Sequence, residues 1–169
     1  TSNICTAQAL LAIVSAAYAV YHGPQGIKKI AESVSQLTKN FADKLKQSGY
    51  ELYSNDFFDT VTIKTLDKTE KIYKNALDQG VNIRKVNSEM LAVSFDERKN
   101  LYRANQLLKI FNCSETIKES MNESLSNIPK NLLRTSTYLD HPVFNRYHSE
   151  TEMLRYLKKL EDSDIALNK

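Results

Sequence analysis

The chain has 169 residues, enough for one ordinary domain with extensions but not for the two full-sized lobes of a large enzyme. With 41% hydrophobic and 25% charged residues, four Gly and three Pro, its composition is that of a globular protein and excludes disordered, collagen-like and disulfide-scaffold classes. The net charge of +3 is not gathered in one segment, so it gives no electrostatic footprint for nucleic acid.

The first predicted helix is apolar on every side. All residues from Ala7 to Tyr21 are apolar or aromatic except Gln8 and Ser15. Such a helix is expected to be buried all round, and it is too short to cross a bilayer, which takes about 20 apolar residues. Because the chain starts at Thr1 without a Met and reaches this run almost at once, we expect a piece of a longer polypeptide.

Gly23 and Pro24 are expected to end this helix, and Pro24 can also begin the next one. The second helix has a one-sided apolar stripe and stops before Gly49. Residues 1–49 are therefore predicted to be two helices, one buried and one amphipathic.

Residues 50–111 have the pattern of a small α+β domain. Apolar residues in alternation predict four strands, over 50–53, 57–64, 81–85 and 91–95. Asp67 followed by Glu70 indicates the start of a helix that Gly80 closes, and a second helical face runs over 101–111. The order of elements predicts a mostly antiparallel sheet covered by helices.

The remaining residues divide into a linker and a helical segment. Residues 112–130 are polar and are predicted to be an exposed linker. Residues 131–169 are richer in aromatic residues and histidines and end in a helix, for which Ser149 and Glu152 form a capping box.

No standard catalytic signature is present: there is no Gly-rich phosphate loop, no nucleophile elbow and no zinc spacing. His141 and His148 stand close to Asp140 and Glu150, but nearness in sequence is a weak sign of a metal site. Hydrogen-bonded structural histidines are the favoured interpretation, and no metal is expected.

Cys5 and Cys113 match no metal or redox spacing and are expected to be reduced thiols of an intracellular protein. Cys5 is interpreted as a small buried residue rather than a reactive thiol at a helix start. The short polar side chains Asn3, Thr6 and Gln8 lie at the start of the first helix, where they would either cap it or border an anion site. The residues alone leave both possibilities open.

Two long strings of residues resemble one protein family. The first comprises residues 1–12 and 18–24, and the second comprises residues 141–161 and 164–168. Both are similar to the P-protein family of the glycine cleavage system, the decarboxylating glycine dehydrogenases. Between them the resemblance is looser but collinear, and the linker is the least similar part. Arg98-Lys99-Asn100 replace small hydroxyl residues typical of the family, so no role of those hydroxyls is carried over.

The resemblance implies a pyridoxal-phosphate enzyme of the aspartate-aminotransferase-like fold. Such an enzyme decarboxylates glycine and passes the aminomethyl group to the lipoyl arm of the H-protein. It also implies two similar halves. Residues 1–49 would link from a large domain outside this chain, residues 50–111 would be the small domain of the first half, and residues 131–169 would start the second half. The Schiff-base lysine would lie outside the chain, so the fragment is expected to be inactive and to bind no pyridoxal phosphate.

Active sites of this fold lie where paired halves meet, so the resemblance puts seven residues near the active site: Asn3, Thr6, Gln8, His141, Asn145, His148 and Glu150. The expected partners are the rest of the P-protein, its paired half or subunit, the lipoylated H-protein and glycine, with no nucleic acid and no membrane. The expected location is a bacterial cytoplasm, or the mitochondrial matrix in a eukaryote. The alternative interpretation is a non-catalytic small-molecule-binding or dimerisation module.

Overall fold

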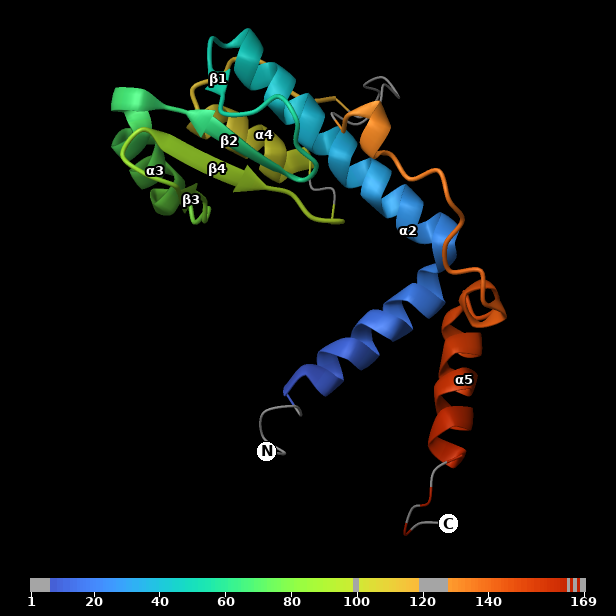
Figure 1. Cartoon of the computed structure of the whole chain (residues 1–169). Coiled ribbons are helices and arrows are strands. Elements are labelled where there is room, and N and C mark those ends of the chain that lie inside the picture. Colours follow the sequence, from blue (N-terminus) through green and yellow to red (C-terminus); the bar gives the residue numbers. More distant parts are fainter. Residues whose placement is uncertain (1–6, 99–100, 119–127, 164, 166, 168–169) are drawn as a thin grey trace. The chain divides into compact units, whose positions relative to one another are not determined.

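The computed structural model describes residues 7–98, 101–118, 128–163, 165 and 167 (Figure 1). The chain forms two compact units, one of residues Ile30–Arg134 and one that combines Thr1–Lys29 with Thr135–Lys169. Helix α2 (Ala7–Gln47) contributes to both units. The boundary between the units therefore falls inside this helix.

Helix α2 consists of two helical pieces that meet at Gly23, whose φ of 63° and ψ of 178° are not helical. Pro24 has no N–H, and its fixed φ suits the first residue of a helix. The Gly-Pro pair therefore ends one helix and begins the next, as the sequence predicted. We call the piece before the break, Ala7–His22, the leading helix.

The unit Ile30–Arg134 is an α+β layer, which confirms the predicted fold class at that level. Its sheet has the order β1-β2-β4-β3, and every neighbouring pair is antiparallel. The strands are β1 (Glu51–Leu52), β2 (Thr60–Lys64), β3 (Arg84–Lys85) and β4 (Met90–Ser94), and the helices are α3 (Thr69–Asp78) and α4 (Leu101–Ile110). Strand β2 begins at Thr60 rather than at Phe57.

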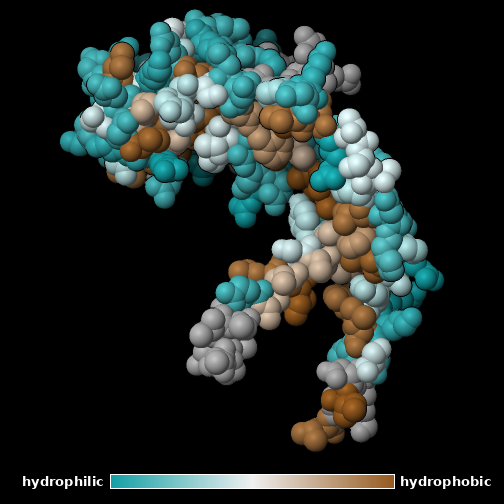
Figure 2. Space-filling view, in the orientation of Figure 1, coloured by the Kyte–Doolittle hydropathy of each residue, from teal (hydrophilic) through white to brown (hydrophobic). Residues whose placement is uncertain are grey.

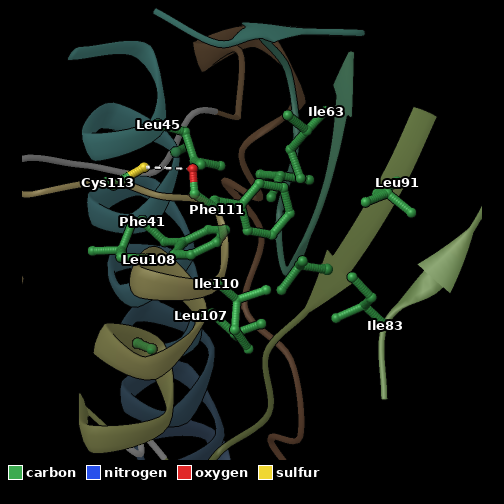
Figure 3. Packing of buried hydrophobic residues seen from close by; sticks show 14 of the residues in the cluster. Phe41, Leu45, Ile63, Ile83, Leu91, Leu107, Leu108, Ile110, Phe111 and Cys113 are labelled. Atoms are coloured by element: carbon green, nitrogen blue, oxygen red, sulfur yellow. Dashed lines mark hydrogen bonds between the residues drawn. The ribbon is translucent and has the colours of Figure 1, made fainter. Parts of the chain in front are cut away.

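The core of this unit lies between the central strands and the helices. Val61 and Ile63 of β2 face Val93 and Leu91 of β4 across the sheet and are almost fully buried. Aromatic and branched side chains from α2, from α4 and from the residue that follows α4 pack against them in Figure 3: Phe41, Leu45, Leu108 and Phe111, each no more than 1% exposed. This cluster is the apolar stripe that the sequence predicted for the second helix, joined to the inner face of the sheet.

The three helices of this unit end in the same way. A residue with positive φ follows each helix: Gly49 (87°), Gly80 (67°) and Asn112 (58°). The next amide N–H then bonds to a carbonyl five residues back: Tyr50 to Leu45 (3.0 Å), Val81 to Ala76 (2.8 Å) and Cys113 to Leu108 (2.9 Å). This Schellman geometry satisfies carbonyls that the helix leaves without donors, and it confirms both predicted glycine stops.

The start of α3 differs from the prediction, because neither Asp67 nor Glu70 caps it. A short 3-10 helix (Leu66–Lys68) precedes α3, and no side chain caps its start or that of α3. Instead the buried hydroxyls of Thr65 and Thr69 lie 2.6 Å apart, and the Thr69 hydroxyl donates to the Leu66 carbonyl at 2.8 Å. Buried hydroxyls that satisfy one another and the backbone thus replace the expected acidic cap.

The predicted exposed linker is partly buried. Cys113 and Ile117 belong to the core, 6% and 4% exposed. Both backbone groups of Ile117 bond to the Asn105 side chain: its N–H donates to Oδ1 (2.7 Å) and its carbonyl accepts from Nδ2 (3.1 Å). Residues 112–118 therefore continue the α+β unit, and most of the rest of the predicted linker, 119–127, lies outside the described residues.

In the other unit, a loop leads into α5 (Glu150–Asp162), which starts with the predicted capping box. The Ser149 hydroxyl accepts from the Glu152 N–H at 3.3 Å and donates to the Glu152 carboxylate at 2.9 Å. The carboxylate therefore bonds to the hydroxyl, whereas the expected capping box uses the Ser149 N–H. No helix within the described part of the chain is long and apolar enough to traverse a membrane.

The apolar side chains in the first half of the leading helix are exposed in the described part of the chain. Leu10 and Leu11 are both 67% exposed, Ile13 is 62% exposed and Val14 is 55% exposed. Figure 2 shows brown and tan residues along this part of α2. A helix that the sequence predicts to be buried on every side thus has its largest apolar side chains at the surface here.

Candidate functional site

The leading helix ends against the loop before α5, and three of the seven predicted site residues lie there: His141, Asn145 and His148. We call this region, residues 21–24 of α2 with residues 138–149, the helix corner. Both parts belong to the same compact unit. The corner contains two predicted site histidines, the Gly23 break and the start of α5.

His148 closes the end of the leading helix. Its Nδ1 lies 2.8 Å from the carbonyl oxygen of Tyr21. A carbonyl can only accept, so Nδ1 carries a proton and donates, and in the neutral ring Nε2 is then an acceptor. The last four carbonyls of a helix lack intrahelical donors, and the imidazole supplies one of the missing bonds.

Gly23 makes room for this contact. It is buried, and a Cβ placed on it would lie 2.7 Å from Cε1 of His148 and 2.7 Å from the carbonyl oxygen of Phe144. On the other side of the break, the hydroxyl of Tyr138 donates to the Pro24 carbonyl at 2.7 Å. The loop therefore holds the backbone on both sides of Gly23, and only a residue without a side chain fits between.

His141 and Asn145 fix the shape of the loop itself. The Nδ1 atom of His141 accepts from the Val143 N–H at 3.2 Å and so caps the 3-10 helix Pro142–Asn145. The Asn145 amide donates to the carbonyl of Leu139 at 3.1 Å and to that of His141 at 3.4 Å, next to the positive φ of 54° at Leu139. Both loop histidines are hydrogen-bonded to backbone groups, in line with the structural interpretation.

The remaining predicted site residues do not join this cluster. Glu150 begins α5 and is exposed, and Gln8 is exposed in the first turn of the leading helix. At a rise of 1.5 Å per residue, Gln8 lies about 20 Å along the helix from His22, so no small ligand can touch both ends. Asn3 and Thr6, with Cys5, lie outside the described residues.

Sequence reasoning missed Tyr21 and Tyr138 as members of the corner. The pair Gly23-Pro24 predicts the break in the helix. The contacts at the break involve the backbone carbonyls of Tyr21 and Pro24, and every residue has a carbonyl, so the sequence does not mark these two. Nothing near Tyr138 in the sequence identifies it as the partner of the Pro24 carbonyl. The aromatic contacts of His22 were not anticipated either: its ring lies 4.3 Å from that of Tyr18 and 5.1 Å from that of Tyr21. These side chains make the last turn of the leading helix aromatic.

Cys113 has the features of a packing residue rather than a nucleophile. Burial raises the pKa of its thiol, and a hydrogen bond with Ser48 only partly offsets this. Burial also raises the pKa of the neighbouring Tyr50 hydroxyl, and the charge of a Cys113 thiolate would raise it further. Because nucleophilic cysteines need a lowered pKa and access to solvent, the raised pKa and the burial of Cys113 favour a packing role.

Comparison with known proteins identifies the family. Residues 1–111 match the family described as glycine cleavage system P-protein. The chain belongs to this family. Over all 169 residues it is 98% identical to the glycine dehydrogenase (decarboxylating) of Pelagibacter ubique. Over 99% of its length it is 49% identical to that of Photobacterium profundum and 48% identical to that of Aliivibrio fischeri.

The chain spans 18% of the length of each of these P-protein relatives. Within the described residues, no group of three His, Cys, Asp or Glu side chains could hold a metal ion. The described lysines are exposed apart from Lys39 and Lys44, which pair with Asp43 at 2.8 Å and Glu115 at 3.1 Å. Among the described residues, no lysine is buried in the way that favours a Schiff-base lysine.

Proposed function

We propose that this chain is part of an enzyme that decarboxylates glycine with pyridoxal phosphate and passes the aminomethyl group to the lipoyl arm of the H-protein. The observation that carries the proposal is the family match over residues 1–111, together with 98% identity to a glycine dehydrogenase (decarboxylating) over every residue of the chain. The activity belongs to the longer protein, since the chain spans 18% of that relative.

The proposed organisation follows from the same resemblance. Residues 50–111, with the helix before them, would be the small domain of the first half of an aminotransferase-like enzyme, and residues 131–169 would begin the second half. The four-stranded antiparallel sheet with helices packed on it supports this division. Pyridoxal phosphate, held by residues outside this chain, supplies an electron sink for the carbanion left when carbon dioxide departs.

The contribution of this chain is to shape the site rather than to perform the chemistry. We propose that the seven predicted residues lie in two groups. Asn3, Thr6 and Gln8 form the group at the start of the leading helix, and His141, Asn145 and His148 of the loop, with Glu150 at the start of α5, form the other. The length of the leading helix supports this division, because Gln8 lies about 20 Å along it from His22. The polar end before the helix is the group that we propose borders the active site.

The test is a reconstitution of the full-length protein that contains this chain. With pyridoxal phosphate and lipoylated H-protein, we expect release of carbon dioxide from glycine, measured with carboxyl-labelled substrate. The 169-residue chain alone should release none and should give no Schiff-base absorbance band with pyridoxal phosphate. Failure of the full-length protein to act on glycine would refute the activity, and a Schiff base on the isolated chain would refute the division of labour.

A further inference from the structure

We propose that His148 is a positioning residue of this enzyme, which acts by holding the end of the leading helix and does not touch the substrate. The inference rests on the proposed function. It starts from the contact of 2.8 Å between Nδ1 of His148 and the Tyr21 carbonyl, which lies in the last turn before the Gly23 break. The helical hydrogen bonds are interrupted at the break, so contacts such as this one help to hold the direction in which the leading helix leaves the corner.

Three further features build this contact into the fold. The missing side chain of Gly23 lets the imidazole approach, since a Cβ there would lie 2.7 Å from Cε1 of His148. Tyr138 holds the Pro24 carbonyl on the other side of the break. Ser149, the next residue along the chain, caps the start of α5. Two consecutive residues thus secure the end of one helix and the beginning of another.

A small rotation of the leading helix at the helix corner produces a large displacement of its far end. Its end near Gln8 lies about 20 Å from the break, so a tilt of about 10° would move that end by roughly 3 to 4 Å. A misplacement of about 1 Å can lower a catalytic rate roughly 100-fold. His148 can therefore govern turnover from a distance that excludes direct contact with glycine bound at the other end.

Replacements of His148 in the full-length enzyme separate positioning from direct chemistry. In His148→Asn, the amide nitrogen can take the place of Nδ1 and donate to Tyr21, but no titrating group remains. His148→Phe keeps a ring against Gly23 and has no donor. Arg155→Gln, at an exposed position of α5, is the matched surface control.

We expect His148→Phe to lower kcat at least tenfold with less than a twofold change in KM for glycine. His148→Asn should restore most of the loss and keep the pH profile of the wild-type enzyme, and Arg155→Gln should be unchanged. Hydrogen exchange should show faster exchange in residues 8–22 of the Phe variant but not of the Asn variant. This readout does not need activity, so it stays valid if the wild-type protein fails to act on glycine and the proposed function falls.

Three outcomes would overturn the proposal. Full activity of His148→Phe would show that the contact positions nothing that matters for turnover. An Asn variant as slow as the Phe variant, with one limb of the pH profile lost, would show that the imidazole acts as an acid or base. Unchanged hydrogen exchange in the Phe variant would show that the leading helix does not depend on His148.

Discussion

Gly23 and Gly80 both have positive φ, 63° and 67°, but different surroundings. A Cβ on Gly80 would meet nothing within 4 Å, whereas a Cβ on Gly23 would meet His148 and the Phe144 carbonyl, each at 2.7 Å. The ψ of 178° at Gly23 also lies outside the left-handed helical region, in a region that is open essentially only to glycine.

We expect Gly23→Ala to destabilise its unit more than Gly80→Ala destabilises the α+β unit. Gly80→Ala should cost about 1 to 2 kcal/mol, the penalty of a side chain in the left-handed region. Gly23→Ala should cost more, because its φ and ψ lie in a region essentially closed to other residues and because the loop must move away from the helix end. Hydrogen exchange measured for each unit separately would give both losses. Equal losses would show that neither the backbone region of Gly23 nor its contact with the loop adds a cost.

At this scale, the sequence predicts conformation better than it predicts partners. Gly49 and Gly80 were predictable as helix stops because positive φ suits glycine. Asn112 has the same role at the end of α4, but asparagine adopts positive φ less often than glycine, so the sequence did not predict this helix stop. The corner contacts were not predictable, since Tyr138 and Pro24 stand 114 residues apart and one of the two groups is a backbone carbonyl.

Among the elements, the start of α5 is the one that a short local motif predicts without any tertiary contact. Its start depends on residues 149–152 alone, and Ser149 accepts from the Glu152 N–H as predicted. Ser149→Ala should lower the stability of α5 by about 1 kcal/mol, because a free N–H at the helix start loses its acceptor. Faster hydrogen exchange in the first turn of α5 would show this loss. Ser149→Asp is the control, since its carboxylate can still cap and should keep the amides protected.

The strands show why element boundaries were harder to predict. Phe57 packs against the core but precedes β2, which begins pairing at Thr60. Alternating burial is the same for an extended loop and for a paired strand, so the apolar pattern alone extends the strand too far. The buried part of the predicted linker has a similar cause: two apolar residues in a polar segment pack because Asn105 satisfies the backbone at Ile117. That bond is a tertiary contact and leaves no local pattern.

For the molecule as a whole, the main feature to explain is the exposed apolar surface of the leading helix. No Asp, Glu, Lys or Arg occurs from Thr1 to Ile27. At about 100° per residue, Leu10, Leu11, Ile13 and Val14 spread over an arc of about 160°, and small Ala residues occupy much of the rest. A single flat partner would cover only part of this apolar surface. Burial on several sides within a longer protein would cover all of it, and the chain spans only 18% of the length of its P-protein relative.

We therefore expect the 169-residue chain to self-associate through the leading helix, because exposed apolar patches associate when nothing covers them. Sedimentation velocity should show the mean size rising with concentration. Leu11→Lys combined with Val14→Lys should shift the chain towards the monomer, whereas Tyr102→Ser, which removes an exposed aromatic from the other unit, should not.

In the full-length protein the same double substitution should harm the protein rather than improve its behaviour in solution. Two lysines placed in a covered interior would each cost several kcal/mol, so folding should fail. A chain that stays monomeric at all concentrations would show that this surface is stable in water and needs no cover.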